Sequence, residues 1–270
     1  MNMGFSEKAA NNRAEPVGYS HERLMQEGWP DDFDFETDHV CQTVFKPFIE
    51  EQLQVLDDYD QQRDLKSDYV FHQHALDAAE DVKNTCAALG LGDRVANNMY
   101  YATLIHDLGK PELSPEIWDI DGTPTTEQKS QKRSHVNLGV EKFSETFKDV
   151  DHPFKGLALD IIKHHHEAIN GEGHYGLTGD QLSNPAKLAS LVEHYDGLTH
   201  PRPHQIERGD KFDPPSLFEK IETRYEGHFD PTIYEAYKAL KIEEYEQSLE
   251  VDAAQSHNAP DPDEPEGQRL

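Results

Sequence analysis

The sequence predicts an all-α protein, and three observations support this. Between about residue 40 and residue 245, apolar side chains recur at spacings of three and four, the period that places them on one face of a helix. No sustained alternation of apolar and polar residues predicts a strand. Clusters of glycine and proline divide the chain into segments of helical length. We therefore expect a helical bundle whose loops converge on one site.

The first expected helix caps the main core. Its apolar face consists of Phe45, Phe48, Ile49, Leu53 and Leu56. Further helices are expected over residues 70–89, 97–106, 126–147, 158–167, 185–198 and 216–242. Breaks that contain glycine or proline, at 109–111, 122–124, 171–179 and 201–203, separate several of them.

Three parts are expected along the 270-residue chain, a length that suits one large domain with appendages. Residues 1–65 form a polar N-terminal segment with the helical cap, 66–245 form the main helical domain, and 246–270 form an acidic, disordered tail. The first forty residues are polar and rich in turn-forming residues, and the end from Gln255 mixes proline with acids. Because neither composition can bury a core, we expect both ends to be mobile.

The composition limits the partners. With 53 acidic against 25 basic residues, the formal net charge is -28, and such a surface repels the phosphates of a polynucleotide. A small phosphorylated substrate stays compatible if local basic residues or bound cations reverse the potential inside a pocket. The charge is interpreted as a solvated acidic surface, with a halophilic host as the alternative, for which stability should fall at low salt.

Cysteine usage and hydropathy predict a cytoplasmic protein. Cys41 and Cys86 are the only cysteines, which gives neither a disulfide framework nor a zinc-type spacing. The first residues lack the apolar core of a signal peptide, and no run of about twenty apolar residues occurs. We expect no membrane partner.

The strongest local signal for chemistry is the adjacent pair His106 and Asp107, at the end of the apolar segment YYATLIHDLGK. Both side chains can turn toward one cation, and the carboxylate can bridge to a second. Lys110 follows one helical turn later and could hold a phosphate oxygen. Taken alone, the pair could equally be a hydrogen-bonded histidine and aspartate at a helix end.

Further ligand-type residues on successive helices favour the metal interpretation. These residues are His74, His135, His165, His166 and Glu193. A metal site in the core of a bundle takes its ligands from several facing helices in this way. Several imidazoles with a bridging carboxylate suit iron or manganese better than magnesium or calcium, which prefer oxygen ligands.

The same residues lie in motifs that resemble, in order, the HD-GYP branch of the HD-domain phosphohydrolases. The resemblance runs from about Phe71 to about Tyr237. The motifs are HALDAA from His74, HDLGK from His106, LSPEIWDIDGTPTTEQ from Leu113, HVNLG from His135, HHEAINGEG from His165, EHYDGLTHPRP from Glu193 and GHFDP from Gly227.

This resemblance implies an HD-domain helical bundle with a metal centre that hydrolyses phosphodiester or phosphomonoester bonds, those of cyclic di-GMP above all. Two divalent transition ions, iron or manganese, are implied. Carried over by position, the metal ligands would be His74, His106, Asp107, His135, His165, His166 and Glu193, with Asp107 as the bridge. His106, Asp107 and Lys110 would be catalytic, and Lys110 and Arg202 would contact the substrate phosphate.

The sequence also departs from the family pattern. Glu193 stands where aspartate is usual, and Val70 stands where three-metal members carry a glutamate, so two ions are expected. The tripeptide Gly173-His174-Tyr175 replaces glycine-tyrosine-proline, and Gln205 replaces a basic residue. The substrate is therefore less well defined by the sequence than the metal centre.

Several other residues have a structural and a functional interpretation. The histidines interpreted as surface or supporting residues are His72, His152, His164, His194, His200 and His204, and the aromatics interpreted as core are Tyr100, Tyr101, Trp118 and Tyr195. Glu167 either orients a neighbouring histidine or is a solvated acid. Residues 1–65 could be a regulatory cap or could form a homodimer.

Three functional classes remain open on the sequence alone. The first is a metal-dependent phosphodiesterase of a cyclic dinucleotide or another nucleotide. The second is a di-iron oxygenase, because the wider HD superfamily includes helical oxygenases with similar ligands. The third is a signalling protein that binds a cyclic dinucleotide without turnover.

Overall fold

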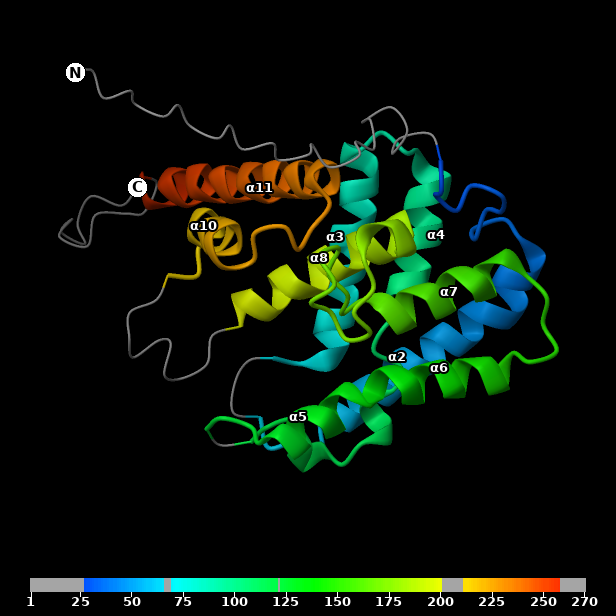
Figure 1. Cartoon of the computed structure of the whole chain (residues 1–270). Helices are drawn as coiled ribbons and strands as arrows, with labels where there is room; N and C mark the ends of the chain where they lie inside the picture. Colours follow the sequence, from blue (N-terminus) through cyan, green and yellow to red (C-terminus); the bar gives the residue numbers. More distant parts are fainter. Residues whose placement is uncertain (1–26, 66–68, 121, 201–210, 258–270) are drawn as a thin grey trace, which may run out of the picture.

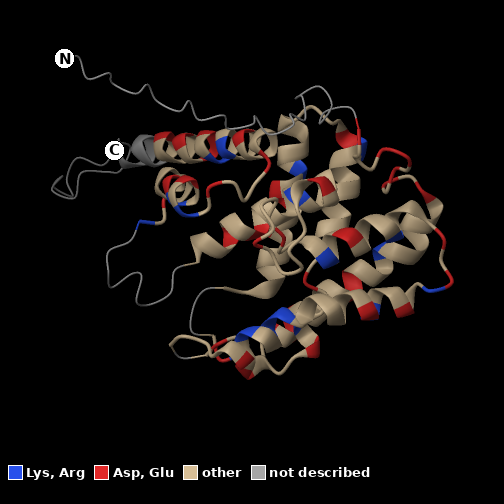
Figure 2. Ribbon diagram, in the orientation of Figure 1, with Lys and Arg blue, Asp and Glu red and all other residues tan. Residues whose placement is uncertain are grey.

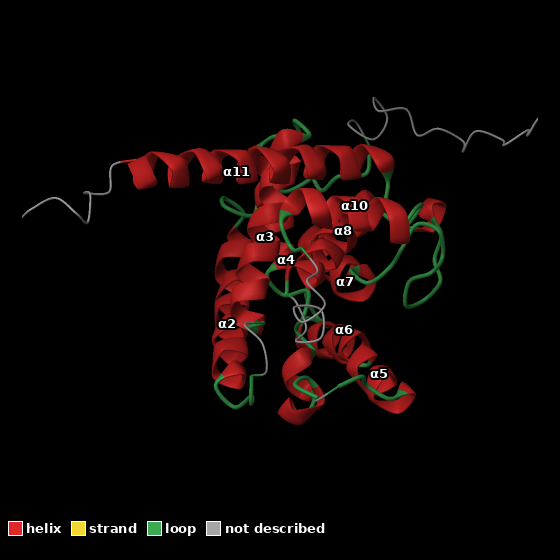
Figure 3. Ribbon diagram, turned by 90° about the vertical axis from the view of Figure 1, so that its left-hand side faces the viewer, coloured by secondary structure: helices red, strands yellow, loops and turns green. Residues whose placement is uncertain are grey.

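The structure is a computed structural model of the chain and describes residues 27–65, 69–120, 122–200 and 211–257. Over these ranges the chain forms helices joined by loops, and its only β-type pairing is an isolated bridge between Asn170 and Thr178 (Figures 1 and 3). The prediction of an all-α protein is confirmed.

The helices surround α3 (Phe71–Ala88), which packs against α2 (Lys46–Asp60), α4 (Asp93–Thr103), α8 (Asn184–Thr199) and α11 (Pro231–His257). The remaining elements, in chain order, are the π-helical turn η1 (Cys41–Phe45), the 3₁₀ turns η2 (Lys110–Glu112) and η3 (Pro115–Ile117), α5 (Thr126–Arg133), α6 (His135–Thr146), α7 (Pro153–His164), η4 (Gly179–Gln181) and α10 (Pro214–Arg224).

One helix expected over residues 126–147 is in fact two, α5 and α6. The Thr125 and Gln128 side chains form a capping box that starts α5. At its end, the Ser134 hydroxyl donates to the Gln131 carbonyl at 2.6 Å, and His135 Nδ1 bonds the Lys132 carbonyl at 2.6 Å. These side chains compete with backbone N–H groups for the last carbonyls of α5, and a new helix begins at His135.

The helix expected over residues 216–242 is likewise two, α10 and α11. Gly227, between them, has φ +78°, a left-handed conformation that glycine adopts at little cost. Pro231 then opens α11, and the Asp230 carboxylate accepts the N–H groups of Thr232 and Ile233.

Part of the N-terminal stretch expected to be mobile belongs to the core. Phe33 and Phe35 are buried among the aromatic rings of Phe45 and Phe154. The Asn98 amide holds this segment, because its oxygen accepts from Phe35 N at 2.8 Å and its nitrogen donates to the carbonyls of Pro30 and Phe33. The expectation is therefore wrong for residues 27–40, and residues 1–26 lie outside the described ranges.

At the other end, α11 continues to His257, past residue 245 where the disordered tail was expected to begin. Residues 246–257 are therefore helical, and 258–270 lie outside the described ranges. In Figure 1, α11 crosses one side of the molecule with α10 beside it, and these two helices are in contact.

Acidic side chains are spread over the helices, whereas α5 is basic (Figure 2). Lys129, Lys132 and Arg133 all lie on α5. Both cysteines are buried free thiols. Within the described ranges, no helix has both the length and the apolar character needed to cross a bilayer.

Candidate metal centre

The structure brings together all seven residues expected to bind metal. His74 lies on α3, His106 and Asp107 in the turn after α4, His135 at the start of α6, His165 and His166 directly after α7, and Glu193 on α8. Their ligand-type atoms form two groups, one of His74, His106, Asp107 and Glu193, the other of His135, His165 and His166. Arg202, expected to contact substrate, lies outside the described residues.

Two glycines allow the turn that carries His106 and Asp107 to pack directly on α6. A Cβ on Gly109 would lie 1.9 Å from the His135 carbonyl oxygen and 2.5 Å from Gly139 N. No side chain fits at that separation, so only glycine permits the contact. This contact places Asp107 beside His135, although the two residues come from different parts of the bundle.

The first group surrounds one oxygen of Asp107. Nε2 of His74 and Nε2 of His106 lie 3.3 and 3.2 Å from Asp107 Oδ2. The same two nitrogens lie 2.9 and 3.3 Å from Glu193 Oε2. Two imidazole nitrogens and two carboxylate oxygens thus converge on a single point.

The second group faces the other oxygen of Asp107. Nε2 of His135 lies 3.2 Å from Asp107 Oδ1, and Nε2 of His165 lies 3.7 Å from it. The ring centroid of His166 is 5.2 Å from that of His135, and its Nδ1 is 3.9 Å from Glu193 Oε1. Asp107 therefore stands between the two groups, as a bridging ligand must.

Hydrogen bonds on the outer side of each ring fix which imidazole nitrogen faces the centre. Nδ1 bonds a main-chain carbonyl in His106 (Thr103, 2.7 Å), His135 (Lys132, 2.6 Å) and His165 (Ile162, 3.0 Å). A carbonyl only accepts, so each Nδ1 carries a proton, and Nε2 is the nitrogen that each ring turns toward the centre. In His74, Nδ1 meets the Asp196 carboxylate at 2.6 Å instead.

The inward-facing nitrogens are close to one another. His74 Nε2 and His106 Nε2 are 3.0 Å apart, and His135 Nε2 and His165 Nε2 are 3.3 Å apart. Lone pairs that face each other at these separations repel unless a cation or a proton lies between them. Outer hydrogen bonds that aim Nε2 inward are also the usual support of metal-binding histidines.

The carboxylates lead to the same conclusion. Both oxygens of Asp107 and Oε2 of Glu193 are buried, and burial is costly for an ionised group. Among the described residues, the polar atoms that surround these oxygens are imidazole nitrogens of the centre and, at Asp107 Oδ2, the Lys110 ammonium. Burial raises the pKa of Asp107, but Lys110 and His106 outweigh it and hold this pKa well below its usual value. Burial also raises the pKa of Glu193, but His74 outweighs it and holds this pKa well below its usual value. The centre therefore contains two anionic carboxylates whose oxygens suit divalent cations.

Two of the histidines are neutral, which is the form that binds metal. Burial, with His106 nearby, lowers the pKa of His165 to about 3. Burial and His165 lower the pKa of His166 well below its usual value. Near neutral pH both rings can act as ligands without first losing a proton.

Lys110 is buried against the centre. Its Nζ forms an ion pair with Asp107 Oδ2 and lies 4.3 Å from the ring centroid of Phe71 and 5.7 Å from that of Trp118. The lysine thus compensates the charge of Asp107 inside an aromatic enclosure. Whether it also contacts a substrate phosphate stays a prediction.

Glu167 has neither of its two expected roles. It is buried, and its carboxylate accepts the N–H groups of Tyr175 at 2.6 Å and Leu177 at 2.9 Å. These bonds fasten the glycine-containing loop beside the centre. Gly173 lies so close to Glu167 that a Cβ would approach the Glu167 Cα to 2.4 Å, which explains the glycine at this position.

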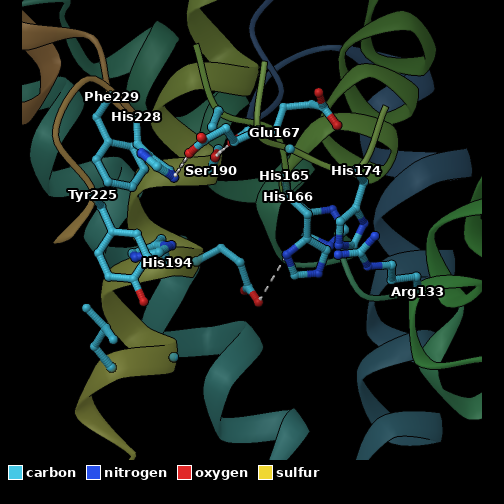
Figure 4. Close-up of a pocket in the computed structure, with 16 residues that line it drawn as sticks. Arg133, His165, His166, Glu167, His174, Ser190, His194, Tyr225, His228 and Phe229 are labelled. Carbon is cyan, nitrogen blue, oxygen red and sulfur yellow. Dashed lines mark hydrogen bonds and ion pairs between the residues drawn. The ribbon is translucent and has the colours of Figure 1, made fainter. Parts of the chain in front are cut away.

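A pocket of about 400 Å³ opens beside the two groups, and His165, His166 and Glu193 form part of its lining. Arg133 and His174 lie on one side of it, whereas His194, Tyr225, His228 and Phe229 lie on the opposite side (Figure 4). Sequence reasoning assigned no role to Arg133 or Tyr225, which lie outside the motifs, and none to Phe229, which lies in the GHFDP motif.

The other histidines divide between the pocket and supporting positions. His194 lines the pocket. His164 turns away from the centre and pairs with Asp160 at 2.7 Å, as expected of a surface residue. His152 belongs to a separate group with Asp38 and Cys41, where its Nδ1 accepts the Phe154 N–H and caps α7. His204 lies outside the described residues.

Comparisons with known proteins agree with this geometry. A family model described as HD domain matches residues 43–233. The chain is 26% identical over 178 residues to a cyclic di-GMP phosphodiesterase of Pseudomonas aeruginosa, which covers 65% of this chain and 41% of that protein. It is 22% identical over 220 residues to a cyclic di-GMP phosphodiesterase of Thermotoga maritima, covering 80% and 56%.

A third relative, 3′3′-cGAMP-specific phosphodiesterase 1 of Vibrio cholerae, is 24% identical over 143 residues, or 53% of this chain and 32% of that protein. The chain thus spans between about a third and just over half of the length of these relatives. The family match covers most of the chain and contains all seven residues of the two groups. The chain therefore belongs to the HD-domain family, within its phosphohydrolase branch.

Proposed function

We propose that this protein is a metal-dependent phosphodiesterase that hydrolyses a cyclic dinucleotide, with cyclic di-GMP and 3′3′-cGAMP as the first substrates to test. Three relatives with these names support the substrate class. The observation that carries the proposal is Asp107, whose two buried oxygens face two separate groups of imidazole nitrogens.

The proposed centre holds two divalent cations, iron or manganese, one in each group. Such a nitrogen-rich ligand set suits these metals. His74, His106 and Glu193 would hold one ion, and His135, His165 and His166 the other, with Asp107 shared. When bound, the cations supply positive charge that lowers the pKa of water and neutralises the phosphoryl oxygens.

The chain's own residues then position the substrate and balance charge. Arg133, from the basic helix α5, lines the pocket beside the centre and offers a guanidinium to a phosphate oxygen. Lys110 keeps Asp107 ionised through its ion pair. The pocket volume of about 400 Å³ lies within the range of small-molecule sites. No protein side chain needs to act as a separate base.

The two alternative functions have less support. A di-iron oxygenase would use a similar ligand set, but the relatives found are phosphodiesterases. A binding protein without turnover would be expected to lose ligands first, and all seven converge here. Substrate-triggered oxygen uptake would favour the former, and tight binding without hydrolysis the latter.

A cytoplasmic location and a homodimer are also part of the proposal. Two buried free thiols are consistent with a reducing compartment. Size-exclusion chromatography with light scattering tests the dimer.

The proposed activity can be tested directly. The full chain, loaded with manganese or iron(II), should convert cyclic di-GMP or 3′3′-cGAMP to a linear product, as measured by chromatography. A chelator should abolish the reaction and added metal should restore it. His106→Ala and Asp107→Ala should each abolish hydrolysis and lower the metal content. Full activity in the metal-depleted double variant, or no turnover of either nucleotide by the loaded protein, would overturn the proposal.

A further inference from the structure

The side of the pocket opposite Arg133 is aromatic. His194 lies on α8, directly after Glu193, and Tyr225 and Phe229 lie in the segment between α10 and α11. The ring centroid of His194 is 4.3 Å from that of Tyr225 and 5.2 Å from that of Phe229. We call these three residues the aromatic wall. Each is partly exposed and lines the pocket (Figure 4).

Hydrogen bonds hold the wall in place. The Ile169 N–H donates to the His228 carbonyl at 2.8 Å, which joins the segment after α10 to the loop that follows the metal-binding histidines. His228 Nε2 also lies 3.2 Å from Glu172 Oε2. The wall and the centre are thereby fixed relative to each other.

The two sides of the pocket differ in chemical character, one basic and the other aromatic. Among the described residues that line the pocket, Arg133 is the only lysine or arginine, and it lies with His174 on the side away from the wall. A nucleotide has the same division, because its phosphate is anionic and its base is flat and polarisable. Aromatic side chains bind bases by stacking, and every base has a π-face to offer.

His194 adds a polar group to the wall. Its Nε2 is buried and has no hydrogen-bond partner among the described residues, and a buried polar atom of this kind is unusual. A base edge that reaches this nitrogen would supply the missing partner.

We infer that the aromatic wall of His194, Tyr225 and Phe229 is the subsite for the nucleobase of the substrate. The inference rests on the proposed function, because it takes the substrate to be a nucleotide. In this arrangement, phosphate binds between the metal centre and Arg133, and the base packs on the wall. The wall then determines preference for nucleotides over other phosphate esters.

The test compares GMP with ribose 5-phosphate, which has the same phosphate and sugar but no base. Calorimetry on the manganese-loaded full chain should give at least tenfold tighter binding of GMP. Tyr225→Leu, which removes the ring, should weaken GMP binding about ten- to hundredfold. Its effect on ribose 5-phosphate should stay within about twofold. Tyr225→Phe keeps the ring and is the matched control, for which GMP binding should change by less than about threefold.

Phe229→Leu provides a second variant if Tyr225→Leu unfolds, and thermal unfolding checks both. Equal affinities of the wild-type protein for the two ligands, or equal weakening of both ligands in the leucine variants, would overturn the inference. Turnover is measured separately. A protein that binds GMP through the wall but hydrolyses neither cyclic dinucleotide would retain the base subsite and refute the phosphodiesterase.

Discussion

The carboxylate of Asp196 should determine how tightly the first group binds metal. Its Oδ2 lies 2.6 Å from His74 Nδ1, and the two side chains are 15% and 0% exposed. A hydrogen bond to a charged group contributes about 1.5–3 kcal/mol, which corresponds to roughly ten- to 150-fold in affinity. Loss of outer hydrogen bonds to metal ligands typically costs about 10–100-fold in metal affinity. We therefore expect Asp196→Ala to raise the Kd for manganese by about 10–100-fold.

The assay is a competition titration of the full chain with a fluorescent metal indicator. Asp196→Asn keeps an acceptor for the Nδ1 proton but loses the charge, so its Kd should lie between those of the wild type and Asp196→Ala. Asp160→Asn is the matched control, because Asp160 pairs with His164 at 2.7 Å outside the two groups. Unchanged manganese affinity in Asp196→Ala, or an equal loss in Asp160→Asn, would refute the role of Asp196 in orienting His74.

Three further predictions concern the histidine run, the close glycine contact and pH. His165→Ala should remove most of the metal at one group, whereas His164→Ala should keep the wild-type metal content. Elemental analysis measures the metal content of both variants. Equal contents would contradict the assignment of His165, and not His164, as a metal ligand. Gly109→Ala places a Cβ 1.9 Å from a carbonyl oxygen of α6 and should cost about 3 kcal/mol or more, lowering Tm by roughly 6–12 °C. Gly156→Ala, where a Cβ meets nothing within 4 Å, should not lower Tm, and similar melting of both variants would contradict the packing argument. Burial lowers the pKa of His106, but Asp107 raises it to about 9, so metal must displace a proton below that pH. Manganese affinity should therefore rise between about pH 6.5 and 9, and a flat profile would contradict this.

The sequence predicted the helices and the seven clustered residues well, because both leave local marks. Apolar spacing indicates a helix face, and the HD pair with its ordered histidines indicates a shared centre. The close contact of Gly109 with α6 explains how residues so far apart in sequence meet. Such a contact depends on the packing of two elements, so it cannot be inferred from either segment alone.

Other features were missed for identifiable reasons. The break at Ser134 arises from side-chain bonds to carbonyls, which serine and histidine also make in many uninterrupted helices. The break at Gly227 and Pro231 was signalled by both residues and should have been predicted. Burial of Phe35 depends on Asn98, which is 63 residues away, so composition alone assigned that segment to a mobile end.

The residues that line the pocket are harder still to predict from sequence, because tertiary packing brings them together. Tyr225 lies outside the motifs and Phe229 lies in GHFDP, but neither position indicates a place in the pocket. The packing of their segment against α8 and its hydrogen bond with the Ile169 N–H bring both residues beside Glu193. For Glu167, the sequence suggested a role that the structure does not support. Its position after the histidine run pointed to the metal, but its carboxylate accepts N–H groups from the loop instead.

The central claim is that Asp107 bridges two cations. Anomalous diffraction from manganese-soaked crystals of the full chain tests it most directly. We predict two anomalous peaks, one between Asp107 Oδ2, His74, His106 and Glu193, and one between Asp107 Oδ1, His135, His165 and His166. The absence of any peak between these residues in crystals with saturating manganese, or a single peak that Asp107 does not contact, would contradict the claim.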